Sequence, residues 1–163
     1  MGTPTAAYSP RKIGLGLALA LFINPFATPE AVKQYRDHFK PSSEFSEPRV
    51  VVALNVVSAA DESKLQELKK TSDLSRLLRD SGNYLLNVPG PNTIDKVRMD
   101  GRDEKYLQKI SKREVVGTPD AVNEQIRQRA EEFGADEIML TMMYYSLSDK
   151  IDTLRLSARA LLD

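Results

Sequence analysis

The sequence predicts an α/β fold built on a parallel sheet, as in part of a βα barrel. Apolar runs that suit buried strands alternate along the chain with amphipathic segments that suit helices. This alternation favours a parallel sheet whose strands are joined by right-handed helical crossovers. The clearest strands are predicted over residues 15–23, 50–57 and 137–142. A complete eight-unit barrel needs about 250 residues, so these 163 residues supply fewer than half of the units.

The first apolar run, Ile13–Ile23, has two interpretations. The basic pair Arg11-Lys12 precedes it, as basic residues precede the apolar core of a signal peptide, and residues 1–27 would then be the leader of a small exported protein. The run is too short to cross a membrane as a helix. The residues that follow, 24–27, are bulky and interrupted by proline rather than rich in small side chains. We therefore favour a buried strand over residues 15–23.

Two predicted helices open with the same kind of capping sequence. Thr28-Pro29-Glu30 and Thr118-Pro119-Asp120 each place a hydroxyl, a proline and a carboxylate at a helix start. The hydroxyl accepts a hydrogen bond from a free backbone N–H, proline suits the first turn, and the carboxylate complements the helix dipole. We predict that these helices end near Phe39 and Phe133, the second at a left-handed Gly134.

The middle of the chain continues the alternation and then loses it. The β-branched run at 50–57 predicts a strand, and a helix is predicted to begin at Asp61-Glu62, with Lys69-Lys70 on its solvated surface. Residues 83–101 contain prolines and glycines without any periodicity, which indicates either a functional loop such as a lid or a disordered segment. A short helix is predicted over 104–111.

The last part of the chain predicts a strand followed by a helix, after an extended entry at Val115-Val116. The apolar run that begins at Ile138 is typical of a strand covered on both faces, as in parallel sheets. Ser148 is predicted to cap the final helix. The predicted buried stripe of that helix consists of Ile151, Leu154, Ala158 and Leu161.

Composition excludes several kinds of site. Acidic and basic residues balance at 23 each and the pI is about 6.6, so charge does not direct the chain to nucleic acid or acidic membranes. The chain has no cysteine, which excludes disulfides, thiol nucleophiles and thiolate metal sites. Its single histidine, His38, cannot form a histidine-based metal cluster within one chain and is expected on the surface. We expect no bound metal and a cytoplasmic location.

Three stretches carry a resemblance to a known family. They are residues 14–42, residues 49–68, and the passage from Val115 that contains VVGTPDAV and GADE. In order and spacing they resemble the C-terminal half of bacterial luciferase-like, flavin-dependent monooxygenases, over most of the chain. The resemblance implies a partial (β/α)8 TIM barrel of roughly the last three βα units, in one truncated domain over residues 1–163.

The resemblance also implies a reaction and a set of site residues. Reduced FMN and O2 would oxygenate a small organic substrate, and a flavin reductase is one candidate partner. Residues 1–10 resemble the polar turn near the flavin phosphate, where Thr3, Thr5 and Tyr8 match hydroxyl positions, although Pro4 removes a backbone donor. The strand ends of the resembled barrel place Asn24 and Tyr144 on the wall of the substrate pocket. The family's histidine near the flavin has no counterpart here, so the catalytic residues are unknown.

These observations leave three hypotheses for the function. In the first, the chain is half of a luciferase-like oxidoreductase, and is inactive or incomplete without a complementing barrel half. In the second, it is a non-catalytic remnant or a binding module that covers its open strand edges by forming a homo-oligomer. In the third, it is a small exported protein with residues 1–27 as its signal peptide.

Overall fold

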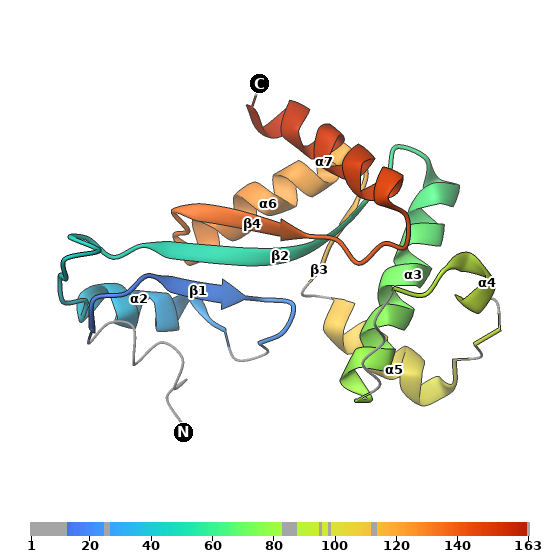
Figure 1. Ribbon diagram of the computed structural model, residues 1–163, viewed down its shortest axis with the longest axis horizontal. Helices are drawn as coiled ribbons and strands as arrows, with labels where there is room; N and C mark the ends of the chain where they lie inside the picture. Colours follow the sequence, from blue (N-terminus) through green and yellow to red (C-terminus); the bar gives the residue numbers. More distant parts are fainter. Residues whose placement is uncertain are drawn as a thin grey trace. The chain divides into compact units, whose positions relative to one another are not determined.

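The chain folds into alternating strands and helices (Figure 1). The computed structural model describes residues 13–24, 27–82, 88–94, 96–97, 99–111 and 114–162. Its elements, in order, are β1 (Leu17–Ala20), α2 (Pro29–Asp37), β2 (Val50–Ser58), α3 (Glu62–Asp80), α4 (Pro91–Ile94), α5 (Gly101–Ser111), β3 (Glu114–Gly117), α6 (Pro119–Phe133), β4 (Glu137–Thr141) and α7 (Leu147–Leu162). They belong to two compact units, residues 1–54 with 126–140, and residues 55–125 with 141–163.

In the first unit, β2 is the strand with which the others pair. β1 runs parallel to it, with Leu17 opposite Val50, and β4 pairs with it as well. Figure 1 shows these strands lying side by side. On β2, Val52 and Leu54 are fully buried, whereas the intervening Val51 is only half-buried. Because side chains alternate across a strand, this part of β2 has one covered face and one face that is less covered.

Two polar side chains fasten the start of β2 within this unit. The hydroxyl of Tyr35, on α2, donates to the Leu15 carbonyl at 2.9 Å and accepts from the Arg49 N–H at 3.2 Å. The carboxylate of Asp136 accepts from the Val50 N–H at 2.7 Å and from the Arg36 guanidinium at 2.9 Å. Tyr35 and Asp136 thereby satisfy backbone groups that a strand entry otherwise leaves unpaired.

In the second unit, the end of β2 pairs in parallel with β3, from Asn55 opposite Glu114 to Ser58 opposite Gly117. A compact apolar cluster lies around this strand end. Its buried members are Val57, Ala59, Leu65, Leu68 and Tyr144, with Val116 and Met142 packed against them. Both units therefore confirm the predicted α/β class with parallel strand pairing.

The strand predictions are confirmed with small shifts at their ends. β2 and β4 lie within one residue of the predicted ranges, but β1 covers only 17–20 of the predicted 15–23. The chain turns after β1 because the Ile23 and Asn24 N–H groups donate back to the Ala20 carbonyl, at 3.0 and 2.9 Å. Ile23 is 62% exposed, so the end of this apolar run lies outside the core.

The predicted helices at Pro29, Glu62 and Pro119 are confirmed as α2, α3 and α6, although α2 ends at Asp37 rather than near Phe39. Thr28 caps α2 through its hydroxyl, which accepts from the Ala31 N–H at 3.3 Å. Gly134 has a φ of +53°, the left-handed conformation predicted for the end of α6. Within the irregular stretch the structure contains the short helix α4, and α5 begins at Gly101, three residues before the predicted start.

Two predictions for α7 are wrong. Ser148 does not cap the helix, because the hydroxyl of Ser146 accepts from the Asp149 N–H at 3.4 Å and the helix begins at Leu147. The predicted buried stripe is exposed: Ile151 by 38% and Leu154 by 46%. Ala158 is exposed too, and the side chain of Leu161 lies outside the described part.

Two further predictions about burial are wrong. Lys69 is not on the solvated surface, since its side chain is 20% exposed and pairs with Glu114 and Asp73, whereas Lys70 is exposed as predicted. The strand β4 is not covered on both faces, since Met139 is 51% exposed. Among the described residues, no helix is long and apolar enough to cross a membrane.

Candidate functional site

The second unit has a pocket at the carboxyl end of β2, the end at which parallel α/β folds bind their ligands. Its volume is about 450 Å³, within the range of small-molecule sites. The pocket is lined by the strand end and by the starts of two helices: Ser58, Ala59, Ala60, Asp61, Lys64 and Leu68, with Asp149, Asp152, Thr153, Arg155 and Leu156.

The floor of this pocket is held by the backbone of Ser58. Its N–H donates to the Tyr144 hydroxyl at 3.0 Å, and its carbonyl accepts from the Thr153 hydroxyl at 3.1 Å. Tyr144 in turn donates to the Val56 carbonyl at 2.9 Å. The Ser58 hydroxyl is buried and has no hydrogen-bond partner among the described residues. A buried hydroxyl of this kind is normally satisfied by water or by a ligand.

Charged side chains surround the pocket and largely neutralise one another. The Asp61 carboxylate caps α3 by accepting from the Lys64 N–H at 2.9 Å. The Lys64 ammonium lies 3.0 Å from the Asp149 carboxylate, and Asp152 and Arg155 form a further exposed pair. The lining therefore holds three carboxylates and two cations.

This charge balance decides which ligands fit. A helix N-terminus attracts phosphate when its N–H groups are free, but here Asp61 already places a carboxylate there. The pocket is therefore unsuited to the phosphate of FMN. It better suits the neutral or cationic part of a small organic molecule.

The predicted site residues are placed as follows. Thr3, Thr5 and Tyr8 lie outside the described residues. Asn24 is half-buried in the turn after β1, in the first unit. Tyr144 is fully buried beneath the pocket floor, and burial raises the pKa of its hydroxyl. The binding roles of all five residues stay predictions.

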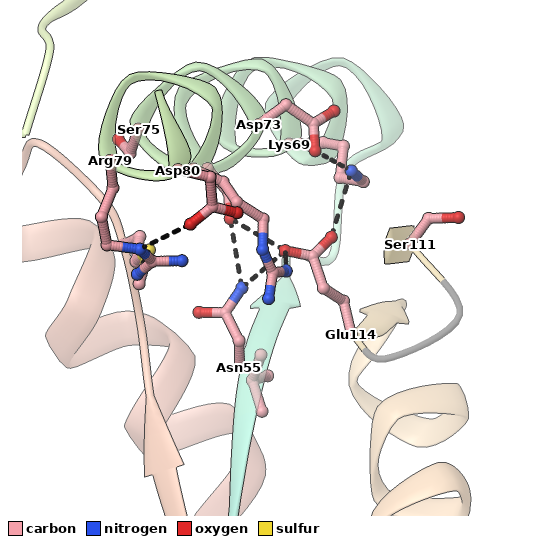
Figure 2. Close-up of polar contacts among 12 residues, drawn as sticks. Asn55, Lys69, Asp73, Ser75, Arg79, Asp80, Ser111 and Glu114 are labelled. Atoms are coloured by element: carbon pink, nitrogen blue, oxygen red, sulfur yellow. Dashed lines mark hydrogen bonds and ion pairs between the residues drawn. The ribbon is translucent and has the colours of Figure 1, made fainter. Parts of the chain in front are cut away.

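A buried ionic cluster is the second polar feature of this unit (Figure 2). Glu114, the first residue of β3, receives the Asn55 amide at 2.8 Å and the Arg76 guanidinium at 2.9 Å on one carboxylate oxygen. Its other oxygen lies 3.2 Å from the Lys69 ammonium. Figure 2 shows Glu114 reaching from β3 towards α3, with Asn55 approaching from β2. The Arg76 and Glu114 side chains are 2% and 1% exposed.

The contacts of the cluster hold two strands and a helix together. Removing charges from water is costly unless they are paired and hydrogen-bonded, and Glu114 is paired with two cations while Asn55 and Ser72 donate to it. The cluster therefore joins β2, β3 and α3. A sequence signal for it exists: Lys69, Ser72 and Arg76 recur at helical spacing on one face of α3.

A larger cavity of about 610 Å³ lies in the first unit, near Leu15, Phe45 and Glu137. It is at the amino ends of the strands, where residues of a barrel usually serve stability rather than catalysis. Among the described residues no group of acidic or histidine side chains could hold a metal ion. His38 is exposed, with its Nδ1 3.0 Å from the Gln34 carbonyl.

No known protein-family model matches the chain. Two uncharacterized proteins of Bacillus subtilis (strain 168) resemble it in sequence. YwcH is 30% identical over 150 residues, which are 92% of this chain and 45% of YwcH. YceB is 28% identical over 137 residues, which are 84% of this chain and 41% of YceB. The chain therefore spans less than half the length of these relatives.

Solved structures extend the comparison. The match to apo-MsnO8 covers 96% of this chain and 47% of the MsnO8 chain, with a TM-score of 0.71 and 28% sequence identity. The monooxygenase RslO1 from Streptomyces bottropensis matches 98% of this chain with 45% of its own, at a TM-score of 0.63 and 24% identity. The match to the EDTA monooxygenase EmoA from Chelativorans sp. BNC1 covers 99% of this chain and 46% of EmoA. Its TM-score is 0.50 and its sequence identity is 12%. The last two likenesses concern the fold alone.

Proposed function

We propose that this chain forms part of the barrel of a luciferase-like, flavin-dependent monooxygenase that acts on a small organic substrate with O2. The observation that carries the proposal is the match to MsnO8 over 96% of the chain. The names of RslO1 and EmoA add support for an oxygenase, since both are monooxygenases with the same kind of fold. The chain would be roughly the last three βα units of a (β/α)8 TIM barrel.

The described residues would serve the substrate rather than the flavin phosphate. Reduced FMN, when bound, supplies the electrons that activate O2. The pocket beside Ser58 would hold an organic group at the end of β2, with Tyr144 and Thr153 keeping that strand end in place. Thr3, Thr5 and Tyr8 remain our proposed contacts to the phosphate, and Asn24 our proposed pocket wall.

Activity would require the remaining barrel units, because the chain corresponds to 45% of YwcH and 47% of MsnO8. The alternative is a binding module without catalysis. The exposed apolar residues of α7, Leu147, Ile151 and Leu154, favour that alternative. A flavin reductase would be a further partner of the complete enzyme.

FMN binding tests the proposal. The 163-residue chain would be co-expressed with the part of YwcH outside the match, and the purified sample titrated with FMN by flavin fluorescence. We expect binding that Thr3→Val with Thr5→Val weakens by roughly tenfold, as loss of hydrogen bonds to a charged group would. Thr93→Val, an exposed threonine of α4, is the matched control and should leave binding unchanged. A purified complex that does not bind FMN would contradict the proposed function.

A further inference from the structure

The cavity in the first unit combines apolar walls with charged side chains. Its volume is about 610 Å³, which is within the range of small-molecule sites. It lies at the starts of β1, β2 and β4, and all of its lining residues belong to the first unit. Its apolar walls consist of Leu15, Leu17, Ala18, Phe45 and Val51.

Small residues leave room for a ligand between these walls. Gly16 lines the cavity without a side chain, and a Cβ atom at this position would lie 3.7 Å from the ring of Phe45. Ala18 and Val51 are partners in the register of β1 and β2, so their side chains lie on the same face of the sheet. Ala18 is exposed and Val51 is half-buried. A ligand can therefore reach this apolar surface.

Two charged side chains of the cavity have no partner of opposite charge. The Arg49 guanidinium and the Glu137 carboxylate form no ion pair, either with each other or with another residue that the structure describes. Asp136 differs, because its carboxylate already accepts from the Val50 N–H at 2.7 Å and lies 2.9 Å from the Arg36 guanidinium. The cavity thus presents one available cation and one available anion.

This pair of charges discriminates between kinds of ligand. Exposed charges without partners are normal on a protein surface, since water solvates them. Here, however, charges of both signs line one apolar cavity. A simple carboxylate would pair with Arg49 but be repelled by Glu137, and a simple amine would meet the reverse. A ligand that carries both groups can pair with both residues, and a guanidinium holds a carboxylate in a favourable two-pronged geometry.

We propose that this cavity binds an amino acid with an apolar side chain. Its carboxylate would pair with Arg49 and its ammonium group with Glu137, while its side chain would lie against Phe45, Ala18 and Val51. The proposed site needs neither FMN nor O2. It therefore adds a binding activity to the proposed function and can be tested without it.

Binding of L-phenylalanine to the 163-residue chain tests the proposal. NMR of the backbone amides would follow the titration, and the largest shifts are expected at Gly16, Ala18 and Val51, which line the cavity. Hydrocinnamate is the same molecule without the amino group, and phenethylamine is the same molecule without the carboxylate. Each should bind about fivefold more weakly, because each loses one ion pair.

Variants of the cavity provide the second part of the test. Arg49→Gln with Glu137→Gln should weaken phenylalanine binding at least about tenfold, because both ion pairs are lost. Arg102→Gln with Glu104→Gln removes the same charges at exposed positions of α5, and should change binding by less than about twofold. Ala18→Phe fills the cavity from an exposed position and should abolish binding. Circular dichroism checks that each variant folds.

Four outcomes would overturn the proposal. Phenylalanine causes no shifts at the cavity residues, hydrocinnamate or phenethylamine binds as tightly as phenylalanine, the Arg49 and Glu137 variant binds as well as its control, or folded Ala18→Phe still binds. If Ala18→Phe does not fold, the two charge variants and the two analogues still decide the question. Because FMN is absent from every measurement, none of these outcomes bears on the proposed monooxygenase.

Discussion

At the residue scale, Tyr144 does more for the architecture than its predicted place on a pocket wall implies. Its hydroxyl contacts the Val56 carbonyl, the Ser58 N–H and the Thr153 hydroxyl, at 2.9, 3.0 and 3.5 Å. It is the junction between the end of β2 and α7. The pocket floor therefore depends on a side chain that does not line the pocket itself.

Replacing this hydroxyl should destabilise the second unit. Tyr144→Phe leaves the buried Ser58 N–H without its acceptor, and an unsatisfied buried donor costs about 1–3 kcal/mol. Tyr145→Phe is the matched control, since Tyr145 is 63% exposed and should change stability by less than about 0.5 kcal/mol. Urea unfolding of both variants measures the difference. Equal stabilities for the two variants would show that the junction contributes nothing.

A pH dependence is expected from Asp73, which pairs with Lys69 beside the buried Glu114. Burial raises the pKa of Asp73 above its ordinary value of 3.8, although the Lys69 ammonium opposes this shift. The folded chain thus holds this proton more tightly than the unfolded chain. The contribution of Asp73 to stability is therefore greatest below pH 3.8 and declines as the pH rises to the raised pKa.

Asp73→Asn should remove this decline. At each pH, the free energy of unfolding of the variant is subtracted from that of the wild type. This difference should fall as the pH rises from 3.8 to the raised pKa of Asp73, and should then stay constant. Urea unfolding at intervals from about pH 3 to about pH 7 measures it. Asp37→Asn provides a contrast, because the hydrogen bond from Lys33 lowers the pKa of Asp37 and its difference should therefore rise with pH below 3.8. A difference that grows with pH would contradict the burial of the Asp73 carboxylate.

At the element scale, α7 differs from its prediction in two ways. The helix is capped by Ser146 rather than Ser148, and its apolar side chains are exposed rather than buried. A choice of cap among neighbouring serines depends on backbone geometry, which the residue types of Ser146 and Ser148 do not reveal. The direction of the apolar stripe depends on what covers it, and the polar contacts of Thr153 and Asp149 hold the other face inward. By contrast, α2 and α6 follow their sequence patterns, because Val32, Tyr35 and Ile126 face a core.

The corrected start of α7 makes a direct prediction about two serines. Ser146→Ala should lower stability by about 1 kcal/mol, the usual cost of removing a helix cap. Ser148→Ala should cost less, because Ser148 is exposed and its hydroxyl lies 2.5 Å from the Ser146 hydroxyl without capping the helix. Thermal unfolding monitored by circular dichroism compares the two. A larger loss for Ser148→Ala would restore the cap first expected from the sequence.

At the scale of the whole molecule, the chain corresponds to less than half of YwcH, YceB and MsnO8. Apolar side chains are exposed on α7 and on β4. Parallel sheets depend on cover for both faces. The activity that we propose would therefore require further barrel units besides these residues.

The sequence by itself determined the α/β class, most of the strands and helices, and the absence of cysteine-based chemistry, because periodicity, capping and composition act over a few neighbouring residues. Tertiary structure alone decided the pairing of Glu114 with Arg76 and Lys69, the position of Tyr144 beneath Ser58, and the outward face of α7. Each of these joins residues far apart along the chain. Folding decides which group a polar residue contacts and which surface covers an apolar face. The spacing of neighbouring residues in the sequence holds no information about either.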